Sequence, residues 1–158
     1  MRARLFFWEF NLDIEAQLVF LFMTVDKFQD NPELILERLN IGKDVLDQAI
    51  QNLLKWGLLE IKDNTYEVHD EIVHMSEDSP AYVPFAMLSR QKAAERLSSR
   101  TGNKSANYFF SALFSTDEKF QSSFKKKLLN LIKEAQNEAI NAPIEDVYQL
   151  NIDFIKWS

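Results

Sequence analysis

The sequence contains no cysteine, only three glycines and only four prolines among its 158 residues. The absence of cysteine excludes disulfide bonds, thiol catalysis and thiolate zinc sites, and it fits a reducing compartment. The scarcity of glycine argues against a glycine-rich loop that binds phosphate. Thirteen phenylalanines instead indicate a chain dominated by regular, packed elements.

Long hydrophobic runs are also absent. The longest unbroken apolar run extends from Leu18 to Met23, far short of the ~20 residues that a membrane-spanning helix requires. The amino terminus has the basic start of a signal peptide, but acidic residues from Glu9 onward interrupt any hydrophobic region. We therefore expect a soluble, cytoplasmic protein without contact to a membrane.

The first half of the chain predicts two helices in succession. Asp13 is a suitable cap for a helix that runs to about Phe28 with apolar residues at helical spacing. Asn31 is the expected cap of a second, short helix, with Pro32 at its first position and its end at Leu39.

A third helix and a hairpin follow. The apolar positions of the third helix form a single stripe at helical period: Val45, Leu46, Ala49, Ile50, Leu53 and Leu54. Gly57 is expected to end this helix. The segments "LLEI" and "TYEV" flank Asp63 and Asn64, which suit a tight turn, and Trp56 and Tyr66 are expected to lock this hairpin against the helix. Three helices and a hairpin in this order predict a winged helix-turn-helix.

A domain boundary is predicted near residue 80. The stretch from Ser76 to Pro80 is polar, and Pro80 and Pro84 both disfavour a helix immediately before them. We therefore predict a winged helix-turn-helix domain over residues 1–75, a linker over 76–84, and a second domain over 85–158.

The second domain is predicted as helix, strand, helix, strand, which makes the fold class α+β. A helix from Phe85 to about Ser99 precedes the aromatic segment "NYFFSALF", and Ser115 and Glu118 have the spacing of a capping box. The long helix that follows is expected to end near Pro143, and its apolar stripe comprises Phe120, Phe124, Leu128, Leu131, Ile132, Ala135 and Ala139. The closing "VYQLNIDFI" alternates apolar and polar residues, which is typical of a strand with one buried face.

The two strands of this domain are expected to lie parallel, because a helix connects them. Two strands alone make only a marginal sheet. We expect the sheet to be completed either by the segment from Leu5 to Trp8 or by the same strands of a second copy, so that a homodimer is predicted. Pairing of the two chain ends would also account for Trp8 and Trp157, which lie near them.

Three segments of the chain resemble an uncharacterised bacterial family in which a winged helix precedes a C-terminal domain of unknown function. They are "LERLNIGKDVLDQAIQNLLKWGLLE", "FFSALFSTDE" and the closing "VYQLNIDF". Members of that family often carry a further amino-terminal helix-turn-helix, for which this chain has no room. They also place a proline and an aromatic near the end of the last strand, where this chain has Ile155 and Lys156. The resemblance implies an architecture and, given these departures, the regulatory or oligomerising part of such proteins.

DNA binding by the third helix and the hairpin is the first functional hypothesis. Side chains able to reach bases or phosphates on these elements are Lys43, Gln48, Gln51, Asn52, Lys55 and Lys62. Asp44 and Asp47 oppose it, because the first turns of a recognition helix lie closest to DNA. Residues 1–70 contain seven Lys or Arg and thirteen Asp or Glu, a charge of minus six, whereas 71–158 contain eleven of each. A DNA-binding domain with a net negative charge binds the phosphates of DNA weakly.

The one concentration of basic residues lies on the long helix. It comprises Lys119, Lys125, Lys126, Lys127 and Lys133. A solvated face is one interpretation of such lysines. The other is a docking surface for an acidic partner, such as the acidic half of another copy.

Catalysis and metal binding find little support in the sequence. His69 and His74 are the only histidines, and their spacing suits neither one face of a helix nor one face of a strand, so a shared metal is not expected. Neither histidine has a serine nearby in a recognisable nucleophile motif. We therefore expect that the protein is not an enzyme and that it binds no cofactor and no metal ion. The favoured interpretation is a non-enzymatic bacterial regulatory protein that acts through protein–protein contacts or dimerisation, and the alternative is a transcriptional regulator that binds double-stranded DNA.

Overall fold

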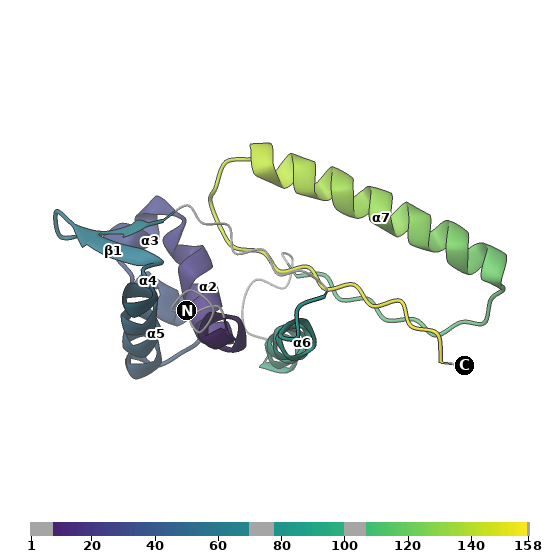
Figure 1. The fold of residues 1–158 in the computed structure, drawn as a ribbon, viewed down its shortest axis with the longest axis horizontal. Coiled ribbons are helices and arrows are strands. Elements are labelled where there is room, and N and C mark those ends of the chain that lie inside the picture. Colours follow the sequence, from purple (N-terminus) through teal and green to yellow (C-terminus); the bar gives the residue numbers. More distant parts are fainter. Residues whose placement is uncertain (1–7, 70–77, 100–106, 158) are drawn as a thin grey trace.

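The computed structural model describes residues 8–69, 78–99 and 107–157. Its fold class is α+β, with helices and one small antiparallel sheet (Figure 1). Residues 8–12 are helical. The elements that follow are α2 (Ile14–Met23), α3 (Asp26–Asp30), α4 (Leu34–Leu39), α5 (Lys43–Trp56), β1 (Leu59–Lys62), β2 (Thr65–Val68), α6 (Tyr82–Ser99) and α7 (Glu118–Asn141).

The first predicted helix is interrupted. Asp13 caps α2 as expected, because its Oδ1 accepts a hydrogen bond from the amide of Ala16 at 2.9 Å. However, α2 ends at Met23, and Val25 adopts extended backbone angles (φ −106°, ψ 119°) before α3 begins. The prediction of one helix through Phe28 was therefore wrong. The break brings Phe28 into the core, where its ring meets Phe22 edge-on at 5.0 Å.

The second helix, α4, begins later than the sequence predicts. Its N-cap is Glu33, which makes no side-chain capping hydrogen bond, and Pro32 lies in the turn before the helix. Asn31 contributes its backbone carbonyl, which accepts from the amide of Leu34 at 3.2 Å. Asn40 ends α4 in the left-handed region (φ 54°) and directs the chain into α5.

The structure confirms the predicted third helix and the predicted hairpin. Leu46, Ala49, Ile50 and Leu53 are buried on one side of α5, and Gly57 ends the helix at a φ of +74°, a conformation that favours glycine. The hairpin pairs Leu59 with Val68 and Lys62 with Thr65. Asp63 (φ 51°) and Asn64 (φ 65°) both adopt left-handed angles, as a tight two-residue hairpin turn requires.

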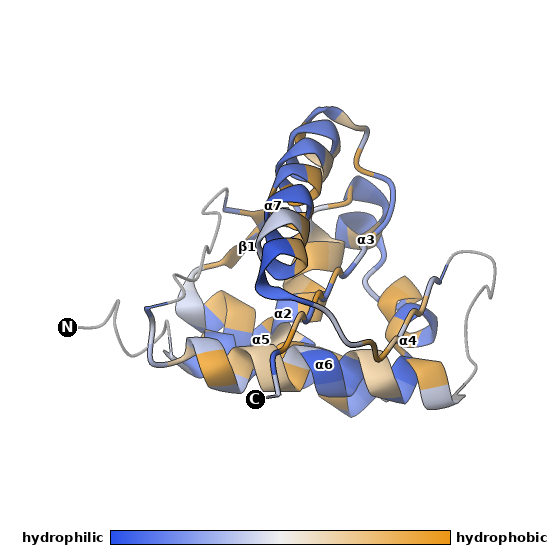
Figure 2. Ribbon diagram, turned by 90° about the vertical axis from the view of Figure 1, so that its right-hand side faces the viewer, coloured by the Kyte–Doolittle hydropathy of each residue, from blue (hydrophilic) through white to orange (hydrophobic). Residues whose placement is uncertain are grey.

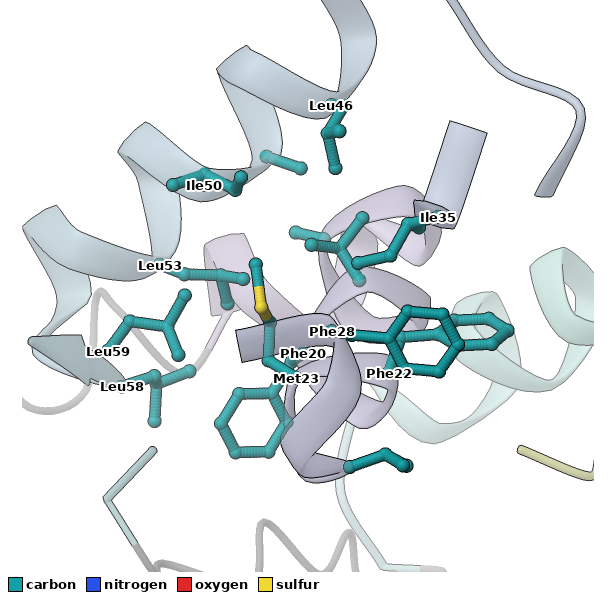
Figure 3. Close-up of a cluster of buried hydrophobic side chains, with 14 of the residues drawn as sticks. Phe20, Phe22, Met23, Phe28, Ile35, Leu46, Ile50, Leu53, Leu58 and Leu59 are labelled. Carbon is teal, nitrogen blue, oxygen red and sulfur yellow. The ribbon is translucent and has the colours of Figure 1, made fainter. Parts of the chain in front are cut away.

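One hydrophobic core joins these elements (Figure 3). Side chains from α2, α3, α4, α5 and the hairpin meet in it, and those with almost no exposed surface include Met23, Phe28, Ile35, Leu46 and Leu53. Trp56 packs at the edge of the core. Its ring meets Phe10 edge-on at 5.9 Å, and its Nε1 donates to Glu9 Oε2 at 2.9 Å. Trp56 therefore fastens the helical residues 8–12 to α5, in addition to any contact with the hairpin.

The predicted helix from Phe85 begins earlier, at Tyr82. Pro84 consequently lies in the first turn of α6, where its missing amide hydrogen costs little because first-turn amides have no intrahelical acceptor. The predicted linker is shortened at this end. Residues 78–81 form turns, and 76–77 lie outside the described residues.

The two predicted strands of the second half are extended segments without a strand ladder. Within the described residues, neither 107–117 nor 143–157 is a strand. Figure 1 shows them side by side and running in the same direction, with α7 connecting them. The predicted direction therefore agrees with the structure, but the predicted pairing does not. A two-stranded ribbon is marginal without a third strand.

The expected third strand is not supplied by Trp8. Trp8 lies in the helical residues 8–12, and Leu5 lies outside the described residues. Trp157 is 85% exposed, so the two tryptophans near the chain ends are not buried together. The single chain thus leaves the ribbon of residues 107–117 and 143–157 without a partner strand among its described residues.

The long helix, α7, is confirmed, but its start differs. Asp117, rather than Ser115, is the N-cap, and its Oδ1 accepts from the amide of Phe120 at 2.7 Å. The capping-box prediction was therefore wrong by two residues. None of the residues of α7 is buried, although the helix carries an apolar stripe, and Figure 1 shows it apart from α2–α5.

Replacing Ile35 by alanine should destabilise the core strongly. Ile35 is completely buried, and removing a buried aliphatic side chain costs about 2–5 kcal/mol of unfolding free energy. The measurement is urea unfolding followed by circular dichroism. The matched control is Leu34→Ala on the same helix, because Leu34 is 46% exposed and its truncation should cost less than about 1 kcal/mol. Equal losses in the two variants would contradict this core assignment.

Candidate functional site

The outer face of α5 carries Lys43, the first of the predicted DNA-contacting lysines. Its Nζ lies 3.1 Å from Glu33 Oε1 and 3.3 Å from Asp47 Oδ1. These hydrogen bonds, that to Glu33 foremost, raise the pKa of Lys43 above its ordinary value. The lysine is thus held by two carboxylates of its own chain.

The other two lysines of this predicted site are paired as well. Lys55 Nζ lies 3.8 Å from Glu9 Oε2, and Lys62 Nζ lies 3.2 Å from Glu67 Oε1 on the neighbouring strand. Neither carboxylate is adjacent in sequence to its lysine, so no local motif signals the pairs. The net negative charge of residues 1–70 was the only feature of the sequence that pointed to such pairs.

The amides of the predicted site also bond within the chain. Gln48 Nε2 donates to Asn52 Oδ1 at 3.2 Å, and Asn52 Nδ2 donates to Asp13 Oδ2 at 3.3 Å. Gln51 is exposed on the same helix. The structure therefore brings Gln48 and Asn52 together on α5, and it joins Asn52 to the carboxylate that caps α2.

The lysines of α7 have a different environment. Lys119, Lys126 and Lys133 recur every seven residues and so lie on one face of the helix, opposite Phe124. Lys125 and Lys127 lie on its flanks. All five side chains are exposed. Across residues 8–69, 78–99 and 107–157, none of the five forms an ion pair, in contrast to the three lysines of α5 and the hairpin.

The closing segment "VYQLNIDF" is attached to α6 through its polar residues. Gln149 Nε2 donates to the backbone carbonyl of Ser89 at 2.7 Å. Arg90 Nε donates to both oxygens of Asp153 at 2.8 Å, and the hydrogen bond to Asp153 is the main cause of the raised pKa of Arg90. We call these contacts, Gln149–Ser89 and Arg90–Asp153, the clasp.

The predicted orientation of this segment is wrong in part. The alternation had indicated that Tyr148, Leu150, Ile152 and Phe154 face a core. Tyr148 and Leu150 are instead 81% and 69% exposed, whereas Phe154 packs against Phe114 and Phe124. The polar residues Gln149 and Asp153 point to the protein's own α6 instead. Sequence reasoning missed this role of Ser89, Gln149, Arg90 and Asp153, although the distinctiveness of the closing motif was a signal.

Further polar contacts join α6 and the closing segment to the core. Lys92 Nζ lies 2.5 Å from Glu15 Oε1 on α2 and 3.2 Å from Glu95 Oε2. Burial of Lys92 acts to lower its pKa, but the hydrogen bonds to Glu15 and Glu95 outweigh this and raise it. A second set of contacts connects residues near the start of the closing segment to α3 and α4: Lys27 Nζ to Glu145 O at 2.9 Å and Arg38 Nη1 to Asp146 Oδ2 at 3.9 Å.

The described residues offer no metal site. His69 Nε2 lies 3.4 Å from Glu60 Oε2, His74 lies outside the described residues, and the described part of the chain holds no group of three side chains able to bind a metal ion. In the same part, none of the helices combines the length and the apolar character needed to cross a membrane.

One family match covers both α5 and the clasp. A family model described as a domain of unknown function (DUF4423) matches residues 8–156. The chain belongs to the DUF4423 family. The match to DUF4423 is continuous across both predicted domains and the linker between them, so it includes α5, α7 and the clasp. No curated protein matches the chain, and no solved structure matches it.

Breaking the clasp should loosen the closing segment locally. In the variant Asp153→Asn, Arg90 loses a charged acceptor, and an exposed ion pair of good geometry contributes up to about 1 kcal/mol. Cleavage by chymotrypsin within residues 147–154, at Tyr148, Leu150 or Phe154, should therefore accelerate roughly fivefold, while the core is not cleaved faster. The control is Glu145→Gln, which removes a nearby charge but leaves the clasp intact. Unchanged cleavage in Asp153→Asn would show that the clasp does not hold the segment.

Proposed function

We propose that this DUF4423 protein is a non-enzymatic bacterial regulatory protein on a winged-helix scaffold, and that it acts through protein–protein contacts, including self-association. The observation that carries the proposal is the pairing of every lysine on the predicted DNA-reading surface with a carboxylate of the same chain. The lysines of α7, which are exposed and unpaired within the described residues, provide the contrasting surface.

The winged-helix part of the proposal rests on the order and packing of the elements. Helices α2, α4 and α5 precede the hairpin, and α5 packs against α2 with its apolar side. In winged helices the last helix before the hairpin is the recognition helix, whose outer face meets its target. The outer face of α5 occupies the corresponding position in the chain.

The charges on that face favour a protein partner over DNA. Affinity for duplex DNA comes largely from lysines and arginines that neutralise phosphates. Here the positive charges of Lys43, Lys55 and Lys62 are already offset by the carboxylates of Glu33, Asp47, Glu9 and Glu67. Phosphate binding would have to break these pairs, and the surrounding carboxylates would repel the phosphates.

The α7 lysines favour an acidic partner surface. Because their side chains form no ion pair in the described part of the chain, they contribute positive potential that no ion-paired carboxylate of the described residues offsets. The acidic half of a second copy, with its net charge of minus six over residues 1–70, has the complementary sign. Reciprocal contacts of this kind suit a two-fold homodimer.

The alternative is a transcriptional regulator that binds double-stranded DNA through Lys43, Gln48, Gln51, Asn52, Lys55 and Lys62. What favours it is the exposed Gln51 on α5 and the position of Lys62 at the turn of the hairpin, where winged helices often meet the backbone of DNA. Lys62 would then have to exchange Glu67 for a phosphate.

The proposal that the protein is not an enzyme rests on its residues. The chain has no cysteine and two histidines, and His69 is placed beside Glu60 without a serine or threonine in a nucleophile motif. A cytoplasmic location is part of the same proposal and rests on the absence of cysteine from the sequence.

Titration with DNA separates the two functions. A labelled random-sequence duplex should show no rise in anisotropy with protein up to about 10 μM at low salt, because the lysines of α5 are paired. If the alternative is correct, binding will appear in the micromolar range and weaken steeply with salt. In that case Lys55→Glu should abolish DNA binding while the assembly state is unchanged. Lys156→Glu should leave DNA binding intact, because Lys156 lies outside the predicted DNA-binding surface.

Reversing the charge of the α7 lysines should weaken self-association. In Lys126→Glu combined with Lys133→Glu, two cations on one helix face become acidic and repel the acidic half of the partner. Light scattering should show a larger monomer fraction than for the unmodified protein, and the unmodified protein should itself dissociate further as salt is raised to about 1 M. A salt-insensitive oligomer that tolerates both changes would rule out the lysines as a contact.

A further inference from the structure

Residues 107–157, which we call the arm, expose an unusual amount of apolar surface. They comprise the two extended segments of the ribbon and α7. In the ribbon, Leu113 is 92% exposed, Tyr108 86%, Tyr148 81% and Leu150 69%. Figure 2 shows hydrophobic residues along both the extended segments and α7. Contiguous exposed apolar surface of this kind marks an interaction site.

The accessible surface of the chain gives the size of this feature. It is 12447 Å², whereas a compact monomer of 18.5 kDa is expected to expose about 8,200 Å². The excess of roughly 4,000 Å² per chain is larger than the about 1,000–2,500 Å² that each partner buries in an obligate homodimer. The chain therefore leaves exposed an area large enough to form a stable interface with another copy.

The arm is held together internally, so its exposed side has a defined shape. Phe154 of the closing segment meets Phe124 of α7 at 5.0 Å and stacks on Phe114 of the other extended segment at 6.4 Å. Phe120 stacks on Phe124 at 5.5 Å. These rings join α7 to both extended segments of the ribbon at one end, while Tyr148 and Leu150 remain exposed further along.

The clasp fixes which side of the ribbon faces outward. Gln149 and Asp153 bond to α6 of the same chain, and neighbouring residues in a strand point to opposite sides. Tyr148 and Leu150 cannot turn toward their own core without breaking these bonds. Their partner must come from outside the described part of the protomer.

We infer that the arm is a dimerisation element whose apolar side is covered by the arm of a second copy. A ribbon of two extended segments has unpaired edges, and two copies related by a two-fold axis would bring four such segments together. Three or more strands with a hydrophobic face are what an independently stable sheet requires. The same patch serves on both copies, as in most homodimers.

A second copy fits this surface better than a different protein for two reasons. The ribbon needs additional extended segments of alternating polarity, and an identical arm supplies them. The unpaired lysines of α7 need acidic groups, and the half of the chain over residues 1–70 is acidic. The inference rests on the proposed function only in that both require protein contacts.

Sedimentation velocity of the full chain at about 0.5–50 μM is the test. The unmodified protein should sediment as a dimer. Leu113→Glu and Tyr148→Glu should each raise the dimer dissociation constant by at least about 100-fold, because each places a charge in an apolar interface. Both side chains are exposed in the protomer, so circular dichroism should show unchanged folding.

The matched control is Ile61→Glu. Ile61 lies on β1, outside the arm, and is 61% exposed, so this variant should remain dimeric. A protein that is monomeric throughout the concentration range would overturn the inference. A dimer that both arm variants leave intact would also overturn it, although the proposed function through protein contacts would survive. The DNA titration decides that function separately.

The absence of cysteine allows a second, independent measurement. A single spin label at Leu150→Cys can report only a distance between copies, since the chain has no other cysteine. A defined intermolecular distance below about 40 Å, the diameter of one compact domain of this size, supports the arm interface. Loss of that signal is expected when Leu113→Glu is added. A dimer in sedimentation without any such distance places the interface elsewhere and overturns the inference.

Discussion

The structure depends on the packing of α2 against α5, in a core that also includes Phe28 of α3 and Ile35 of α4. This single core has to hold everything else, because the second half of the chain contributes little buried apolar surface to it. Val147 packs against its edge, but α6 and the closing segment are joined mainly by polar groups: Lys92 to Glu15, Arg38 to Asp146 and Arg90 to Asp153. Since exposed ion pairs stabilise a fold only slightly, the amino-terminal half carries most of the stability and the arm is attached to it comparatively loosely.

The family match includes both the stable core and the loosely attached arm. It covers the core, α6 and the arm continuously, so the core and its polar attachments to the closing segment belong to one family unit. The closing motif links the two, because its polar residues bond to α6 while its apolar residues remain available. A motif with this double use constrains the residues on both sides of the segment at once.

The sequence allowed good prediction wherever the cause of a structure is local. The stripe of α5, the cap at Asp13, the left-handed Gly57 and the turn at Asp63 and Asn64 each depend on residues within a few positions. The failures have longer-range causes. The break at Val25 exists because Phe28 reaches the core, and the outward orientation of Tyr148 follows from a contact between residues 90 and 153. The pairs Lys43–Glu33 and Lys55–Glu9 likewise join different helices, so the composition indicated an acidic face but not which lysines it neutralises.

The ion pairs on α5 and the hairpin lie outside the hydrophobic core. Four carboxylates, those of Glu9, Glu33, Asp47 and Glu67, hold the three lysines that face outward. None of the four acids belongs to the core, and Glu67 is the least exposed of them. Exchange of each acid for its amide requires no repacking. Such exchanges would make the charge of this face less negative without any change in architecture, so the architecture alone does not fix the sign of the partner that the face selects.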